Sequence, residues 1–247
     1  MVKENKSNLE PPALGGSRFD YGPVGTNEET FHIVFDIETG PQQPQDLARM
    51  TPKGGFPAKA NLVDPEKIAA DIRSKEEAFI KKAALSPTTG QVLAIGVRHH
   101  GKNNIWHQGD NVGREAEAKV LEEFFNFFRA NNTQTWVGWS SNQFDWPFLR
   151  KRAWVHGLQF PIGIFDGVVG ARWLNYQRGI LDAQLAWDEG NSTIRTRLDT
   201  ACKCLGLTGK TEDGSHFYKI YKRDQDRALA YLANDLEITD QLWEIIG

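Results

Sequence analysis

Several features that would assign a chain to a broad class of protein are scarce in these 247 residues. There are only two cysteines, Cys202 and Cys204, and they stand one residue apart. Such a pair supplies neither a disulfide framework nor a complete zinc site, because no second cluster provides the remaining ligands. We interpret both as small apolar residues of a helix, in a protein of a reducing compartment.

We also expect neither a membrane span nor a secretory leader, and basic residues are not in excess. No apolar run approaches the roughly 18 residues of a membrane helix, and the polar start with Pro11 and Pro12 does not resemble a signal peptide. We therefore expect a cytoplasmic protein with no membrane partner. The net charge of −3 argues against a protein that coats DNA through a basic surface. It does not exclude a nuclease, whose carboxylate cluster is acidic without metal.

The hydrophobic pattern predicts an α/β fold with a mixed five-stranded sheet flanked by helices. Residues 1–30 are rich in Pro, Gly, Asn and Glu and are predicted to be a tail or arm, which leaves 31–247 as one domain. Strands are predicted at 31–38, 92–97, 105–107, 136–139 and 162–165, with a turn at Asn103–Asn104. Helices are predicted at 64–85, 114–129, 144–156, 195–205 and 224–246.

Two carboxylates stand in the first predicted strand. Asp36 and Glu38 are two residues apart, so both side chains point to one face, roughly 6–7 Å apart along the strand. Like charges at this spacing favour a cation between them, and hard oxygen ligands select Mg²⁺ or Mn²⁺. The Asp-x-Glu pattern occurs three times in the chain and is also compatible with a solvated strand end. The apolar strand around this pair distinguishes it from the other two.

Two later segments supply further carboxylates. Asp145 follows a predicted strand and a short polar loop and begins a helix, where free N–H groups favour an ionised side chain. Tyr231 and Asp235 lie four apart on the last helix and share a face beside an apolar stripe. Taken alone, the first is compatible with a helix cap and the second with an exposed helix flank.

Together the three segments resemble the three exonuclease motifs of the DEDD superfamily, in its tyrosine (DEDDy) branch. The histidine branch would have His where this chain has Ala230. The likeness spans about residues 31–247 and is greatest to the proofreading exonuclease domain of family-B DNA polymerases and to stand-alone relatives. It includes the stretches 85–87, 90–96, 144–149 with 152–153, and 198–201 with 205–206. The resemblance implies a ribonuclease H-like fold.

The resemblance also implies a reaction, namely removal of nucleoside 5′-monophosphates from nucleic-acid 3′ ends by hydrolysis with two divalent cations. It implies Asp36 as bridging ligand, Glu38 and Asp235 on the first cation, and Asp145 on the second. Tyr231 is expected to orient the attacking water, since a phenol with a pKa near 10 is a poor base at neutral pH. Single-stranded DNA is the expected substrate. A separate polymerase or repair protein is the expected partner, because no polymerase follows Gly247.

Contacts with the nucleic-acid strand are predicted at Thr39, Gly40, Asn142, Phe144 and Phe148. Aromatic rings there would stack on bases without regard to sequence. The chain departs from the family at Ser140, where Asn is usual, and Asn142 is the candidate replacement. Asp182 is expected to cap a helix, with support of the site as its alternative role. An RNA exonuclease and a non-catalytic nucleic-acid-binding module remain as alternative functions.

Overall fold

The computed structural model describes residues 32–161, 180–191, 193–209 and 217–247. The tail predicted at 1–30 and the strand predicted at 162–165 lie outside the described residues. Within the described part of the chain, no helix is both long enough and apolar enough to cross a membrane.

The described residues form a five-stranded sheet of order β3-β2-β1-β4-β5. Its strands are β1 (His32–Pro41), β2 (Gly90–His99), β3 (Lys102–His107), β4 (Thr135–Gly138) and β5 (Ile180–Asp182). β1, β2 and β3 pair antiparallel, whereas β4 runs parallel to both β1 and β5. This confirms the mixed sheet predicted from the sequence. The fifth strand, however, is Ile180–Asp182.

The turn between β2 and β3 corrects one prediction. It lies at His100 and Gly101, which have φ angles of +49° and +70°. Asn103 and Asn104, the predicted turn, are strand residues opposite Arg98 and Val97. A two-residue hairpin turn requires a positive φ at both central positions, and Gly101 meets this requirement without steric cost.

Eight helices are found in the described residues. They are α1 (Pro44–Leu47), α2 (Pro65–Ala84), α3 (Arg114–Ala130), α4 (Asp145–His156), α7 (Ala183–Trp187), α8 (Leu198–Cys204), α9 (Phe217–Tyr221) and α10 (Gln225–Ile246). The five predicted helices are confirmed. Asp64 caps α2 by accepting from the Glu66 N–H, and Asp224 caps α10 by accepting from the Arg227 N–H. α1, α7 and α9 have only four or five residues, too few for a periodic pattern.

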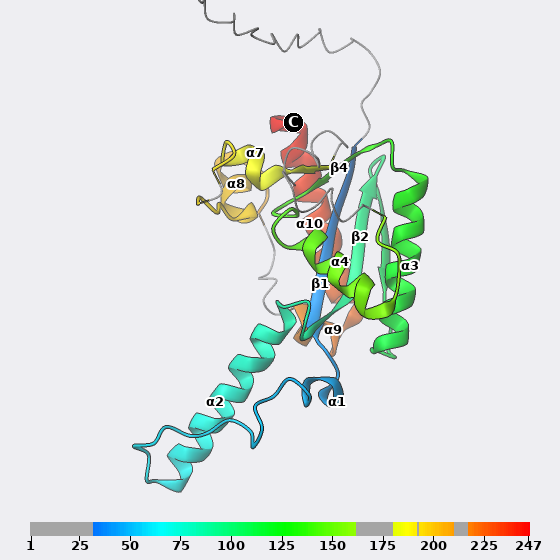
Figure 1. Cartoon of the computed structure of the whole chain (residues 1–247). Coiled ribbons are helices and arrows are strands. Elements are labelled where there is room, and N and C mark those ends of the chain that lie inside the picture. Colours follow the sequence, from blue (N-terminus) through cyan, green and yellow to red (C-terminus); the bar gives the residue numbers. More distant parts are fainter. Residues whose placement is uncertain (1–31, 162–179, 192, 210–216) are drawn as a thin grey trace, which may run out of the picture. The chain divides into compact units, whose positions relative to one another are not determined.

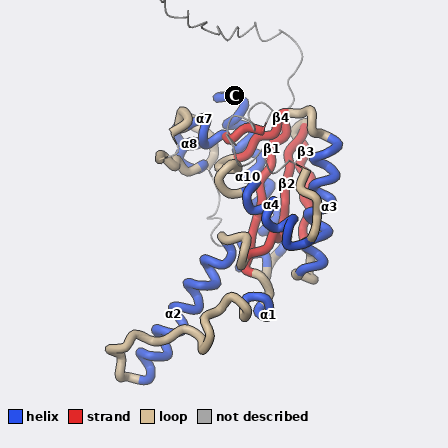
Figure 2. The backbone as a smooth tube through the Cα atoms, in the orientation of Figure 1, coloured by secondary structure: helices blue, strands red, loops and turns tan. Residues whose placement is uncertain are grey.

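The sheet is the middle layer between two sets of helices, as Figures 1 and 2 show. Side chains of β1 alternate between two apolar cores. Ile33, Phe35 and Ile37 pack with the apolar residues of α3 and α4. Val34 packs on the other face with residues of α8, α9 and α10, including the buried Cys202. A carboxylate on an even-numbered position of β1 therefore faces α10.

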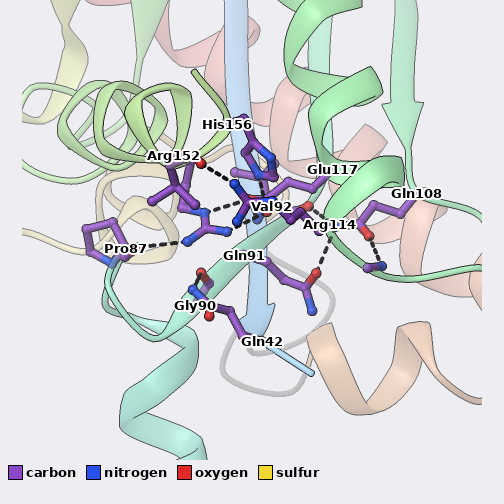
Figure 3. Close-up of polar contacts among 12 residues, drawn as sticks. Gln42, Pro87, Gly90, Gln91, Val92, Gln108, Arg114, Glu117, Arg152 and His156 are labelled. Carbon is purple, nitrogen blue, oxygen red and sulfur yellow. Dashed lines mark hydrogen bonds and ion pairs between the residues drawn. The ribbon is translucent and has the colours of Figure 1, made fainter. Parts of the chain in front are cut away.

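A buried ion cluster, defined as Glu117, Arg152 and His156, ties α3 to α4 (Figure 3). Glu117 Oε2 lies 2.6 Å from Arg152 Nη2 and 2.8 Å from His156 Nε2, and Oε1 accepts from the Val92 N–H at 2.8 Å. Burial alone would raise the pKa of the Glu117 carboxyl. Hydrogen bonds from His156 and Arg152 outweigh it and hold that pKa below its usual value.

Candidate active site

β1 and α10 bring three carboxylates together. Asp36 and Glu38 project from the face of β1 that also carries Val34, as the alternation predicts, and α10 packs on that face. Asp36, Glu38 and Asp235 each offer an oxygen atom, and these atoms lie within 4.8 Å of one another. In the part of the chain that the structure describes, no other three His, Cys, Asp or Glu side chains meet in this way. Of the three Asp-x-Glu pairs, only the pair in β1 places both carboxylates in this group, and Asp235 of a second pair is the third member.

Gly96 of β2 allows α10 to lie this close to the sheet. It is the register partner of Asp36. A Cβ added at Gly96 would lie 2.7 Å from Leu236 Cδ1 and 3.1 Å from Leu232 Cγ, the residues that flank Asp235 on α10. A side chain at residue 96 would therefore press on Leu232 and Leu236, on the same helix as Asp235. The sequence contained this glycine, but its role appears only once the register is known.

Asp145, the first residue of α4, approaches the same strand from the side of β4. β4 pairs with β1 only as far as Val34. Beyond it, Asp145 Oδ1 accepts from the Ile37 N–H at 3.3 Å. Burial, followed by the charges of Asp36 and Asp182, raises the pKa of the Asp145 carboxyl well above its usual value. A cation bound nearby would lower the pKa of Asp145, because an opposite charge favours the ionised carboxylate.

Tyr231 stands one helical turn before Asp235 and is buried, with its ring 6.2 Å from that of Phe217. Burial raises the pKa of its hydroxyl, and the charges of Asp235 and Glu38 raise it further. The phenol therefore keeps its proton at neutral pH. A protonated phenol is suited to donate a hydrogen bond and unsuited to accept a proton, and the role of Tyr231 in orienting a water stays a prediction.

The loop between β4 and α4 contains a strained residue. Ser140 has a φ of +62°, in the left-handed region that Asn and Gly adopt more readily than Ser. Its carbonyl accepts from the N–H groups of Gln143 and Phe144 at 3.0 and 3.1 Å. The backbone at this position is thus one that suits the Asn expected from the resemblance.

Asp182 caps α7, as predicted, by accepting from the Leu185 N–H at 3.1 Å. The same carboxylate also accepts from the Ser140 N–H at 3.1 Å and the Asn142 N–H at 3.0 Å. Burial raises the pKa of Asp182, although these backbone hydrogen bonds oppose the rise. The hydrogen bonds from Ser140 and Asn142 to Asp182 could not be predicted from a local sequence pattern, because they join residues 40 or more positions apart.

Two of the residues predicted to contact nucleic acid, Thr39 and Gly40, lie at the end of β1. The Thr39 hydroxyl donates to the Ala84 carbonyl at 2.7 Å and so fixes the end of α2 beside Glu38. At Gly40, an added Cβ would lie 2.7 Å from Leu93 Cδ1 and 2.8 Å from Tyr218 Cδ2. The backbone of both residues belongs to the strand, and their contact with nucleic acid stays a prediction.

The aromatic residues of α4 correct another prediction. Phe148 is 1% exposed and lies in the core, with its ring 5.4 Å from that of Phe144. This burial contradicts the prediction that Phe148 stacks on a base, because the ring has no open face. Phe144 is only partly buried, and its contact with nucleic acid stays a prediction, as does that of Asn142.

The donor set fits a hard divalent cation. All three clustered donors are carboxylate oxygens, and Asp235 is only 2% exposed, so the group is costly to ionise without a cation. Oxygen donors favour Mg²⁺ or Mn²⁺ over softer metals. The thiols of Cys202 and Cys204 lie in α8 and do not belong to the three-carboxylate group.

Comparison with known proteins gives a family match. A family model described as "Predicted 3'-5' exonuclease related to the exonuclease domain of PolB" matches residues 79–239, which include Asp145, Tyr231 and Asp235. Among curated proteins, a DNA polymerase of Archaeoglobus fulgidus is 27% identical over 77 residues. That match covers 31% of this chain and 9% of the polymerase.

A solved structure supports the fold. The family B DNA polymerase from the archaeon Pyrobaculum calidifontis matches with a TM-score of 0.55 and 20% sequence identity. The match covers 89% of this chain and 25% of the polymerase chain. At this identity the likeness shows the fold, and it confirms the predicted ribonuclease H-like arrangement.

Proposed function

Because this chain belongs to the family of predicted 3′-5′ exonucleases related to the exonuclease domain of PolB, we propose that it is a metal-dependent 3′-5′ exonuclease. Its expected products are nucleoside 5′-monophosphates released from the 3′ ends of single-stranded DNA. The observation that carries this proposal is the meeting of Asp36, Glu38 and Asp235 within 4.8 Å, beside Asp145 and Tyr231.

The carboxylates are assigned to two divalent cations, Mg²⁺ or Mn²⁺. Glu38 and Asp235 would hold one cation together with Asp36, and Asp145 would share Asp36 with the other. When bound, two cations at such a site lower the pKa of the attacking water and stabilise the charge on the leaving oxygen. Asp36 is assigned to both cations because it lies in the three-carboxylate group and its charge also raises the pKa of Asp145.

The remaining work falls to Tyr231 and the backbone. Since the phenol retains its proton and is hydrogen-bonded to Asp235, its O–H would orient the attacking water beside Asp235 rather than remove a proton from it. Thr39, Gly40, Asn142 and Phe144 are the proposed contacts to the strand. Stacking of an aromatic ring such as Phe144 on a base tolerates any base sequence.

DNA is preferred over RNA as the proposed substrate because both named relatives are described as DNA polymerases. An RNA exonuclease is the second candidate, since the carboxylates and the tyrosine act on the phosphate and do not contact the 2′ position. A non-catalytic binding module is disfavoured, because it has no use for a buried group of like charges.

A single assay separates these possibilities. End-labelled single-stranded DNA and RNA of one sequence are incubated with the protein in Mg²⁺, in Mn²⁺ or in EDTA. We expect stepwise shortening from the 3′ end, faster on DNA, and none in EDTA or with Asp36→Ala. Faster shortening of RNA would transfer the proposal to the second candidate.

The matched control is Glu237→Gln, which removes an exposed carboxylate of α10 two residues from Asp235. It is expected to cleave like the wild type. A ladder that persists unchanged in Asp36→Ala would overturn the site assignment, and a wild-type protein that leaves both substrates intact would overturn the function.

A further inference from the structure

Asp182 makes more hydrogen bonds than helix capping requires. One bond, from the Leu185 N–H to Oδ1, suffices to cap α7. The two others hold the loop that precedes α4, through the N–H groups of Ser140 and Asn142. Asp182 is buried and is the register partner of Gly138 at the parallel edge between β4 and β5. One carboxylate therefore joins the ends of two neighbouring strands to a loop.

That loop leads to Asp145 with little freedom. Its carbonyls at Ser140 and Ser141 accept from the N–H groups of Gln143, Phe144 and Trp146, so three backbone hydrogen bonds close the segment 140–146 on itself. At Gly138, a Cβ would lie 2.7 Å from Ser141 Cβ, so the loop also lies directly against β4. A shift at Ser140 or Asn142 is thus transmitted to the first residue of α4.

The position of Asp145 depends on this loop because its own anchor is weak. The Ile37 N–H to Asp145 Oδ1 distance is 3.3 Å, at the long end for a hydrogen bond. Asp145 also lies in the repulsive field of Asp36 and Asp182. A carboxylate held against repulsion needs a rigid backbone, and the bonds of Asp182 to the loop provide it.

We propose that Asp182 is a positioning residue that holds the loop 140–144 so that Asp145 faces Asp36 across the cation site. The inference rests on the proposed function. It extends that function to a residue that is assigned no contact with a cation or with the nucleic acid. Substitutions of groups that orient metal ligands commonly lower metal affinity or activity by roughly 10- to 100-fold.

Two variants separate positioning from capping. Asp182→Ser keeps a side-chain oxygen that can cap α7 but cannot reach three N–H groups. Asp182→Asn keeps the shape, yet its NH₂ group cannot accept from an N–H. The control is Asp188→Asn at the C-terminal cap of α7. Asp188 is a second buried aspartate, whose carboxylate accepts from the backbone N–H and the hydroxyl of Thr196, away from the loop.

The experiment measures the Mn²⁺ dependence of single-turnover cleavage on the full chain, together with calorimetric Mn²⁺ titration of the metal-free protein. Both Asp182 variants are expected to raise the half-saturating Mn²⁺ concentration and to lower the rate by about tenfold or more. They should leave the KM for the DNA strand within about twofold. Elevated Mn²⁺ should restore part of the rate, and Asp188→Asn should change only the melting temperature.

The proposal is overturned if the Asp182 variants match Asp188→Asn in both the activation curve and the calorimetric affinity. A wild-type protein that binds Mn²⁺ but does not cleave would end the proposed function, while the calorimetric comparison of wild type and Asp182→Asn would still decide the positioning role. A wild-type protein that binds no Mn²⁺ would end both.

Discussion

The two ends of α4 bear buried charges in opposite electrostatic settings. At its start, burial and then the charges of Asp36 and Asp182 raise the pKa of the Asp145 carboxyl. In its later turns, Arg152 and His156 meet Glu117, whose pKa is lowered. The first setting makes ionisation costly, and the second makes it favourable. Both lie within one helix of twelve residues.

The like charges at the start of α4 and the opposite charges in its later turns are expected to have different roles, the first in function and the second in stability. Opposite charges that satisfy each other stabilise a fold only while both are present, since removing one leaves the other buried. Like charges that lie close together lower the free energy of unfolding unless a cation neutralises them. Such a group is therefore expected to serve cation binding rather than stability. Changes at the two ends of α4 should therefore affect different measurements.

The largest effect is expected at the like-charged end. Asp235→Asn removes one of three clustered carboxylates and should lower the single-turnover cleavage rate by roughly 1,000-fold, or about 4 kcal/mol. In EDTA the variant should melt at the wild-type temperature or above it, because repulsion falls. Glu237→Gln is the control. Cleavage near the wild-type rate would remove Asp235 from the site.

The opposite-charged end should respond in stability. Glu117→Gln leaves Arg152 with a neutral partner and should lower the free energy of unfolding by about 3–5 kcal/mol, measured by urea denaturation. The cleavage rate of the folded fraction should not change. Glu123→Gln, an exposed change on the same helix beside Lys119, is the control and should cost less than about 0.5 kcal/mol. Equal effects of the two changes would refute the stabilising role of the ion cluster.

The pH dependence of that stability should follow from the lowered pKa of Glu117. A carboxylate with a folded pKa below its unfolded value stabilises fully above the unfolded pKa. That stabilisation is lost as the pH falls through the folded value. The difference between wild type and Glu117→Gln should therefore be largest above pH 4.5 and shrink below it. Urea denaturation at several pH values measures this, and a difference that is constant to pH 3 would contradict it.

A smaller effect on the cleavage rate is expected from the loss of the Tyr231 hydroxyl, the uncharged group of the site. Tyr231→Phe removes a hydroxyl that donates but does not titrate, and should slow cleavage by about 10- to 100-fold. Mn²⁺ affinity, measured by calorimetry, should stay within about twofold. An unchanged rate would show that the hydroxyl does not act on the water. A lost affinity would instead place it among the determinants of cation binding.

The smallest effect concerns the strained loop beside α4. Ser140→Asn should raise the free energy of unfolding by up to about 1 kcal/mol, because Asn adopts the left-handed backbone more readily. Ser74→Asn, on the exposed part of α2, is the control and should be neutral or slightly destabilising. A loss of stability in Ser140→Asn would show that the loop cannot accept the larger side chain.

Much of the site could be predicted because its signals are local. Alternation along β1 placed Asp36 and Glu38 on one face, and helical spacing placed Tyr231 beside Asp235. The long helices were found for the same reason, since their apolar patterns extend over several turns.

The rest depends on partners far away in the chain. Phe148 follows Asp145 on a helix start that suits a substrate groove, yet it points into the core, which only the packing of α4 on the sheet decides. The bonds of Asp182 to the loop join residues 40 or more positions apart. β5 has three residues, too few to be recognised by alternation.

Gly96 has a consequence for which ion the site accepts. The oxygens of Mg²⁺ sites lie at about 2.0–2.1 Å and those of Ca²⁺ sites at about 2.3–2.6 Å, so a few tenths of an ångström distinguish the two ions. A methyl group at residue 96 would press on Leu232 and Leu236, and we expect it to change the spacing of Asp36 and Asp235. Gly96→Ala is therefore expected to alter which ion the proposed site prefers, with no change in the ligands themselves.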